Sequence, residues 1–194
     1  TDPIERGQLA SVPAAASAAS AASIAPVAAD ADAHYARTIT IDLASVVPQI
    51  AAPHRVDNVI DASALDLTPI DMVYLGTCTG GRVKDYREAL TELERGGGVA
   101  PGVRLVVTPA SGEVRDELVR TGMLARFESM GALVQPPGCG SCCGTCGTLP
   151  VDGERIVSSA NRNFRGRMGN TSALIWLASP RECAAAAVRG SIGK

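Results

Sequence analysis

Six cysteines are the side chains of this sequence best able to do chemistry, and the surroundings of three set them apart. Cys78 lies between small residues directly after an apolar run, and Cys139 and Cys142 lie in a glycine-rich segment. Thiolates are soft ligands that select iron–sulfur clusters, zinc or copper(I). A cubane cluster usually takes four cysteines. One distant cysteine plus a Cys-x-x-Cys pair supplies only three ligands, which would leave one metal position open, as in catalytic metal sites.

The remaining cysteines of this segment leave alternatives open. Cys143 and Cys146 follow so closely that four local thiols could form a zinc site with Cys139 and Cys142. The side chains of adjacent residues usually diverge, which disfavours joint use of Cys142 and Cys143. We expect Cys143 and Cys146 to be fillers beside a metal centre or thiols prone to oxidation. A third alternative is that Cys78, Cys139 and Cys142 are ordinary core or loop thiols.

A second chemical feature is the segment NRNFRGR at residues 161–167, which carries three arginines around one glycine. The planar guanidinium of arginine binds carboxylates through two parallel hydrogen bonds. An isolated arginine cluster is usually a solvated basic loop. Because this one follows a predicted strand, beside the cysteine segment, we predict that Arg162 and Arg167 bind substrate carboxylates.

Composition limits the class of protein. Of the 194 residues 46% are hydrophobic but only 3% are aromatic, so the core must consist mainly of Val, Leu, Ile and Ala. A formal net charge of −2 gives no sign of the basic surface that nucleic-acid binding requires. No apolar stretch has the length and residues of a membrane span. Six cysteines without an export signal indicate a reducing compartment, and we expect a cytoplasmic protein.

The first residues differ in composition from the rest. Residues 1–35 are rich in Ala, Ser and Pro, which predicts a low-complexity arm or linker. Because the chain begins with Thr rather than Met, we expect a piece or a processed product of something longer. Residues 36–194 are predicted to form one domain, and the alternation at residues 38–43 predicts its first strand.

Strand and helix patterns alternate through that domain. Short apolar runs predict strands at residues 70–75, 103–108, 131–135, 155–159 and 173–178. Helices are predicted from residue 83 to the glycines at 96–98, after Ser111, at residues 124–130 and after Ser179, with Cys183 in the core. This order predicts an α/β domain of three layers with a mainly parallel sheet.

The chemical segments follow the ends of predicted strands. Cys78 comes directly after the second strand, the segment of Cys139 after the fourth and Asn161 after the fifth. Open α/β sheets bind ligands beyond the carboxyl ends of their strands. We therefore expect these three segments to meet at one edge of the sheet and to form one active site.

Together these motifs resemble the aconitase superfamily, above all the large subunit of 3-isopropylmalate dehydratase (isopropylmalate isomerase). The resemblance runs in the family's order from about residue 38 to residue 191. It is carried by LGTCT at residues 75–79, VAPGV at 99–103, PGCGSC at 137–142, SSANRNFRGR at 158–167 and SP at 179–180, with PH at 53–54 and DNV at 57–59.

The resemblance implies a [4Fe-4S] cluster on Cys78, Cys139 and Cys142, whose fourth iron acts as a Lewis acid on the substrate. It also implies a substrate site lined by Asn161, Arg162 and Arg167. The family dehydrates a 2-hydroxy di- or tricarboxylate and rehydrates it at the neighbouring carbon. The expected function is therefore that of a hydro-lyase that isomerises a 2-hydroxy dicarboxylate such as isopropylmalate or a related substituted malate.

The resemblance covers only the cluster-bearing third domain of a longer family member. It implies that the catalytic base lies on another domain or chain, so no catalytic residue is assigned here. The expected partners are the remaining large-subunit domains, a small swivelling subunit and a small hydroxy-carboxylate substrate, with neither nucleic acid nor membrane.

Some positions depart from the family pattern. Gly80 stands where Asn is usual, and Cys143 and Cys146 stand where the family has residues without a thiol. These changes could alter substrate choice, cluster stability or sensitivity to oxidation. Alternative functions are part of a homoaconitase- or aconitase-type hydratase, a non-enzymatic iron- or redox-sensing domain, and a structural zinc module.

Overall fold

The computed structural model describes residues 28–194 of a chain that divides into two units, residues 1–43 and 44–194. Predictions for residues 1–27, most of the low-complexity arm, lie outside the described residues. The strand predicted at residues 38–43 is wrong, since this segment is irregular and Ile39 and Ile41 are each 67% exposed. Alternation yields a half-buried strand only where a sheet pairs with it and covers its apolar face. These residues belong to no sheet of the described part.

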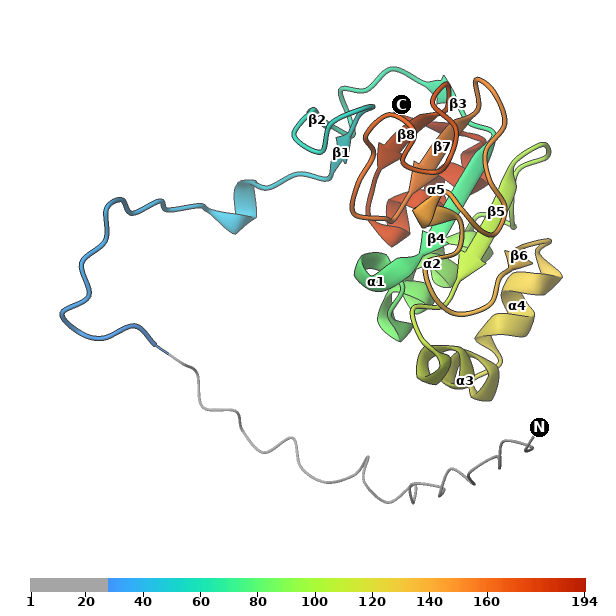
Figure 1. Cartoon of the computed structure of the whole chain (residues 1–194), viewed down its shortest axis with the longest axis horizontal. Helices are drawn as coiled ribbons and strands as arrows, with labels where there is room; N and C mark the ends of the chain where they lie inside the picture. The colour runs from blue at the N-terminus through green and yellow to red at the C-terminus, as the bar shows by residue number, and fades with distance from the viewer. Residues whose placement is uncertain (1–27) are drawn as a thin grey trace, which may run out of the picture. The chain divides into compact units, whose positions relative to one another are not determined.

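Residues 44–194 form an α/β unit around a seven-stranded sheet (Figure 1). Five neighbouring strands are parallel, and the two at one edge are antiparallel. The predicted α/β class with a mainly parallel sheet is therefore confirmed. Across the sheet the strands are β2 (Val59–Asp61), β1 (Gln49–Ala51), β8 (Leu174–Leu177), β7 (Arg155–Ser158), β4 (Met72–Gly76), β5 (Arg104–Thr108) and β6 (Leu133–Val134).

Helices connect the strands at the predicted places. Ser111 and Ser179 cap two of them, because their hydroxyls accept hydrogen bonds from the amides of Val114 and Glu182. Two short strands, β3 (Thr68–Pro69) and β9 (Ser191–Ile192), pair separately. The helical elements of the described part are η2 (Leu43–Ser45), α1 (Thr77–Gly80), α2 (Val83–Arg95), α3 (Gly112–Arg120), α4 (Met123–Ser129), η3 (Gly140–Cys143) and α5 (Pro180–Arg189).

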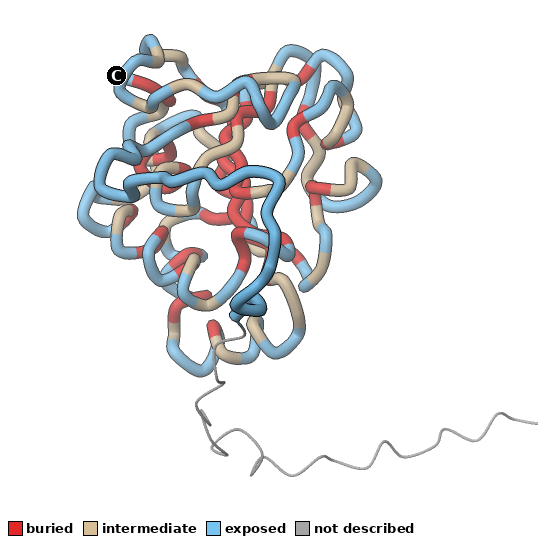
Figure 2. Tube along the Cα trace, turned by 90° about the vertical axis from the view of Figure 1, so that its left-hand side faces the viewer, coloured by how far each residue is buried: buried red, intermediate tan, exposed pale blue. Residues whose placement is uncertain are grey.

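The sheet separates a layer of helices from a layer of loops. On β4, Val73 and Leu75 belong to a large core with residues of α2, α4 and α5. Met72 and Tyr74 belong to a smaller core that includes Cys142 of η3. Side chains that follow one another along a strand point to opposite faces, which explains this division. Figure 2 shows that the buried residues lie in the inner segments of the unit. Cys142 is therefore part of the core on the loop side of the sheet.

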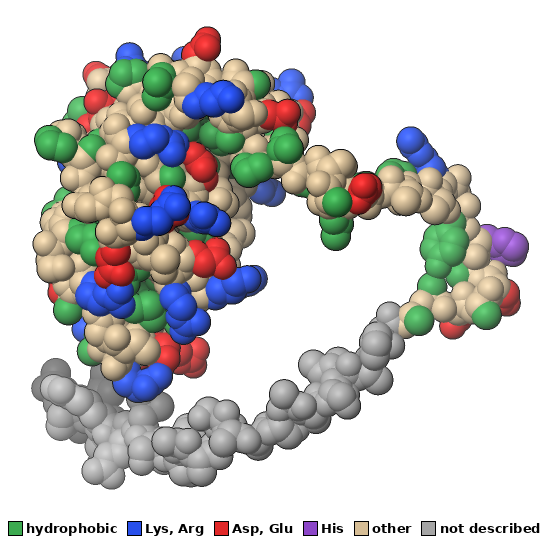
Figure 3. Space-filling view, turned by 180° about the vertical axis from the view of Figure 1, so that it is seen from behind, with side chains coloured by type: hydrophobic (Ala, Val, Ile, Leu, Met, Phe, Trp, Pro, Cys, Tyr) green, Lys and Arg blue, Asp and Glu red, His purple; other side chains and the backbone are tan. Residues whose placement is uncertain are grey.

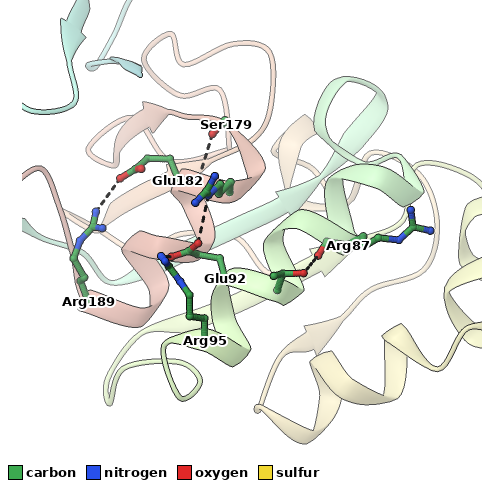
Figure 4. A network of polar contacts seen from close by, with 8 residues as sticks. Arg87, Glu92, Arg95, Ser179, Glu182 and Arg189 are labelled. Atoms are coloured by element: carbon green, nitrogen blue, oxygen red, sulfur yellow. Dashed lines mark hydrogen bonds and ion pairs between the residues drawn. The ribbon is translucent and has the colours of Figure 1, made fainter. Parts of the chain in front are cut away.

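Polar contacts join α2 to α5 at the surface of the helical layer (Figure 4). Glu92 accepts hydrogen bonds from Arg95 of its own helix and from Arg181 Nε of α5, the latter at 3.4 Å. The Arg95 hydrogen bond, followed by the charges of Arg95 and Arg181, holds the pKa of Glu92 below its usual range. Exposed ion pairs contribute at most about 1 kcal/mol. The apolar core that α2 and α5 share beneath these contacts therefore supplies most of the stability.

The outer surface mixes charges of both signs. Basic and acidic side chains lie close to one another on the face seen in Figure 3, and the formal net charge of the chain is −2. Within residues 28–194, no helix combines the length and apolar character that a membrane crossing requires.

Candidate metal centre

The sheet order brings the predicted chemical segments to one edge. Strand β4 pairs in parallel with β5 and β7, and β5 pairs in parallel with β6, so these strands end at the same side. Cys78 lies in α1 directly after β4, the segment of Cys139 and Cys142 follows β6, and Asn161 follows β7. The topology thus agrees with the expectation of one shared edge, and the roles of these residues remain predictions.

The turn that presents Cys78 is tightly confined. A Cβ on Gly76 would lie 2.3 Å from the Thr108 carbonyl oxygen, so the end of β4 tolerates no side chain there. Thr77 has φ 70°, a left-handed conformation that is strained for a β-branched residue. Ser159 accepts a hydrogen bond from the Gly76 amide at 3.0 Å and ties the turn to the end of β7. Cys78 itself is exposed on this rigid turn.

Gly80 has no room for a side chain. A Cβ there would lie 2.6 Å from the Ser159 carbonyl oxygen and 2.8 Å from its hydroxyl. Contacts this short force neighbouring atoms to shift. Because α1 lies this close to Ser159, position 80 has no room for the larger residue that the resemblance implies there.

Buried polar side chains form hydrogen bonds to the segment of Cys139 and Cys142. The Tyr74 hydroxyl, reaching up from β4, donates a hydrogen bond of 2.8 Å to the carbonyl oxygen of Cys139. Burial is the main cause that raises the pKa of Tyr74 to about 12. Gln135 bridges the hydroxyls of Thr108 and Ser141, at 2.9 Å and 3.3 Å. These contacts hold the loop against the strand ends.

Cys142 is the buried member of the proposed ligand set, with 3% of its surface exposed. Burial raises the pKa of its thiol, and the nearby guanidinium of Arg167 opposes that shift. The thiols of Cys139 and Cys78 raise the pKa of Cys142 further, so each of them lies near enough to Cys142 to act on it electrostatically. Arg167 Nη2 lies 3.1 Å from the Cys142 sulfur.

The three cysteines suit a soft-metal centre by their chemistry. Thiolate sulfur is the ligand that iron–sulfur clusters require. Among residues 28–194, however, no group of three His, Cys, Asp or Glu side chains stands close enough to hold a metal ion. The sulfurs of Cys78, Cys139 and Cys142 would have to move together to do so.

Arg162 and Arg167 each make a contact within the chain, but the Nε of Arg167 stays without a partner among the described residues. Arg162 is exposed and donates a hydrogen bond of 2.6 Å to the carbonyl oxygen of Asn161, its neighbour. Arg167 is half-buried, contacts the Cys142 sulfur and lies 5.7 Å from the ring centre of Phe164. The buried Nε of Arg167 has no hydrogen-bond partner in the structure. This orphaned donor is available to an acceptor that enters the site.

Sequence reasoning missed the residues that hold these loops in place. Asn163 is buried, and its amide donates to the carbonyl oxygens of Ala52, at 2.8 Å, and Ile175, at 3.2 Å. It thereby ties the arginine segment to β8 and to the residue after β1. The sequence did carry a signal for each of these supporting residues. Asn163 is an amide within an otherwise basic loop, and Tyr74 is a hydroxyl within an apolar strand.

The other cysteines occupy different surroundings. The sulfurs of Cys143 and Cys146 lie 3.2 Å apart, whereas that of Cys142 contacts Arg167, so the side chains of the adjacent cysteines diverge as expected. A hydrogen bond with Thr145 is the main cause that lowers the pKa of Cys143 to about 7. Cys183 is fully buried, which confirms its predicted place in the core, and burial raises the pKa of its thiol.

Comparison with known proteins agrees with the resemblance noted in the sequence. The profile of the aconitase family (aconitate hydratase) matches residues 61–190. The chain is 45% identical over 166 residues to 3-isopropylmalate dehydratase large subunit 2 of Archaeoglobus fulgidus, covering 86% of this chain and 40% of that protein. It is 47% identical over 161 residues to the homoaconitase large subunit of Thermus thermophilus, covering 83% and 38%.

A third relative extends the pattern. The chain is 47% identical over 166 residues to 3-isopropylmalate dehydratase large subunit 1 of Thermotoga maritima, covering 84% of this chain and 40% of that protein. The chain thus spans about two fifths of the length of these relatives. The match to the family profile and the identities above 40% show that this chain belongs to the aconitase family.

Proposed function

We propose that this chain is the cluster-bearing part of a [4Fe-4S] hydro-lyase that isomerises a 2-hydroxy dicarboxylate. The observation that carries the proposal is the common strand edge at which Cys78, the Cys139–Cys142 loop and the arginine segment emerge. The electrostatic effect of Cys139 and Cys78 on the buried thiol of Cys142 agrees with this arrangement. Membership of the aconitase family supplies the reaction class.

Cys78, Cys139 and Cys142 would hold the cluster. When bound, the cluster supplies a Lewis-acidic iron that makes hydroxide a viable leaving group. The turn of Thr77 and the hydrogen bond from Tyr74 to Cys139 fix the backbone from which two of these thiols project.

The arginine segment would bind the substrate carboxylates. Arg162 is exposed and able to turn toward a ligand, and Arg167 has an orphaned Nε beside the proposed cluster. Charge-assisted hydrogen bonds from guanidinium to carboxylate suit both. Asn161 lies half-buried next to Arg162 and would line the same site.

The proposed isomerisation also needs a general base, which is not among these residues. The relatives are named large subunits and are more than twice as long as the stretch matched here. We therefore propose that the general base comes from another segment or chain, and that the partners are the rest of a large subunit and a small subunit. A reducing compartment such as the cytoplasm suits the six free thiols.

Isopropylmalate or a related substituted malate is the proposed substrate, and homoaconitate the alternative. Two of the three relatives described carry the isopropylmalate name and one carries the homoaconitase name, at similar identity. We propose that the residues that separate these substrates lie outside the cluster-bearing part. Hydration assays with each enoate, after partner subunits are added, distinguish the two.

The first experiment is anaerobic reconstitution of the full chain with iron and sulfide. We expect about four iron atoms per chain with matching acid-labile sulfide, and loss of both in Cys78→Ser. Cys146→Ser is the matched control, because Cys146 is also an exposed cysteine and is not a proposed ligand. Zinc bound in place of iron, or equal iron content in the wild type and in Cys78→Ser, would refute the proposed centre.

A further inference from the structure

Cys143 and Cys146 form a pair of thiols that the proposed function does not use. Their sulfurs lie 3.2 Å apart, and both cysteines are free. Cys143 is half-buried and Cys146 is exposed, so a small molecule in solution can reach the pair. We propose that Cys143 and Cys146 are a reversible dithiol–disulfide site that exchanges with a small disulfide such as oxidised glutathione.

The two sulfurs are already close to bonding distance. A disulfide bond is about 2.05 Å long, so from 3.2 Å the sulfurs have to approach by only about 1 Å. Both S–H groups donate to the same acceptor, the carbonyl oxygen of Gly140, each at 3.2 Å. This shared acceptor holds the two side chains on the same side of the loop.

The backbone around the pair is held from outside. Gly144, between the two cysteines, has φ 74°, and a Cβ on it would lie 2.4 Å from the amide nitrogen of Gly169. Gly147, just after the pair, has φ 76°, and a Cβ there would lie 2.6 Å from the Gln135 side-chain oxygen. Because the loop is already ordered by these close contacts, closing the disulfide costs little further backbone entropy.

The exchange balances with glutathione as the only co-reactant. The thiolate of one cysteine attacks a sulfur of oxidised glutathione, forms a mixed disulfide and releases one glutathione thiolate. The second cysteine attacks the protein sulfur of that mixed disulfide and releases the other. The two cysteine sulfurs are oxidised, one glutathione disulfide is reduced to two thiols, and the two cysteine protons end on those thiols.

Oxidation removes two donors from the cysteine loop. Once the disulfide forms, neither sulfur can donate to Gly140, which lies between Cys139 and Cys142. We expect the backbone of the loop to loosen there and iron retention to fall. This consequence rests on the proposed function, whereas the exchange chemistry does not.

The test uses the reduced, iron-free full chain treated with oxidised glutathione. After alkylation of the remaining thiols, peptide mass spectrometry is expected to find Cys143 joined to Cys146, with the cross-link reopened by dithiothreitol. In Cys143→Ser a glutathione adduct should remain on Cys146, and in Cys146→Ser on Cys143. Cys78→Ser is the control that should keep the cross-link, and circular dichroism checks that each variant is folded.

Three results would overturn the proposal: separate adducts on both cysteines of the wild type, a cross-link between Cys139 and Cys142 in its place, or two unmodified thiols. Iron loading of the oxidised and reduced chains is measured separately. A reduced chain that takes up no iron would defeat the proposed function while the cross-link result stands.

Discussion

Arg167 Nη2 lies 3.1 Å from the sulfur of Cys142, so a proposed carboxylate-binding residue touches a proposed cluster ligand. The two are 25 residues apart in the chain and meet on the loop side of the sheet. The guanidinium opposes the rise in the pKa of Cys142 that burial causes. A single arginine therefore links the ligand set to the proposed substrate site.

Replacing Arg167 by Lys is expected to weaken substrate binding in the assembled enzyme. Lysine keeps the charge but loses the planar pair of donors, and loss of a charged hydrogen bond costs about 1.5–3 kcal/mol. The KM should rise by about tenfold or more, while the iron content of the chain stays unchanged. Arg165→Lys, at an exposed position of the same segment, is the control. An unchanged KM would remove Arg167 from the carboxylate site.

Tyr74 is expected to make stability fall at alkaline pH. Its pKa is raised to about 12 in the folded chain from an ordinary value near 10.0. The contribution is therefore fully present below pH 10 and is lost as the pH rises toward 12. At about 1.4 kcal/mol per pKa unit, the loss amounts to about 2–3 kcal/mol. Urea unfolding between pH 9 and 12 measures it.

Tyr74→Phe should reduce the alkaline slope, and the slope that remains is assigned to Tyr86, whose pKa burial also raises. The variant also loses the hydrogen bond to the Cys139 carbonyl, so we expect it to be about 1 kcal/mol less stable at neutral pH. Tyr35→Phe is the control, because Tyr35 is 67% exposed. If Tyr74→Phe kept the same alkaline slope as the wild type, burial of Tyr74 would not be its source.

Gly80→Asn, which introduces the residue that the resemblance implies at this position, is expected to destabilise this chain. The added Cβ would meet the carbonyl oxygen and side chain of Ser159 below 3 Å, and overpacking of this kind costs about 1–3 kcal/mol. Adding Ser159→Gly should recover part of the loss, since it removes the side-chain contacts but leaves the carbonyl contact. Thermal unfolding measures both variants. Gly112→Ala, where a Cβ meets nothing within 4 Å, should be neutral or slightly stabilising.

Asn163 is expected to stabilise the arginine segment. Asn163→Asp places a carboxylate against the carbonyl oxygens of Ala52 and Ile175 and removes their donor. We expect a loss of more than about 2 kcal/mol at neutral pH, because the acceptors and the charge are buried without a partner. The loss should shrink as the pH falls and the carboxyl is protonated. Asn161→Asp, at a half-buried position two residues away, should cost less, and equal costs would refute the anchoring role.

The element predictions succeeded where a pattern reports local structure. The apolar stripe from Val83 and the glycines after it correspond to α2, Val83–Arg95, and the apolar runs correspond to the parallel strands. The segment at residues 38–43 misled because alternation says nothing about whether a neighbouring strand is present. The topology agrees with the strand-end argument because neighbouring parallel strands end at the same edge of the sheet, while the roles of the residues there remain predictions.

The sequence by itself determined which side chains can serve as soft ligands and where the parallel strands and the main helices lie. It also determined that Cys78, Cys139 and Asn161 follow the ends of strands. Only the tertiary structure decided what supports them. The hydroxyl of Tyr74 meets the carbonyl of Cys139 across 65 residues of chain, and Asn163 meets Ala52 across 111. Such contacts depend on strand order and on the paths of loops across the sheet, which local periodicity does not encode. The 3.2 Å approach of Cys143 and Cys146 depends likewise on a loop held from outside by Gly169 and Gln135.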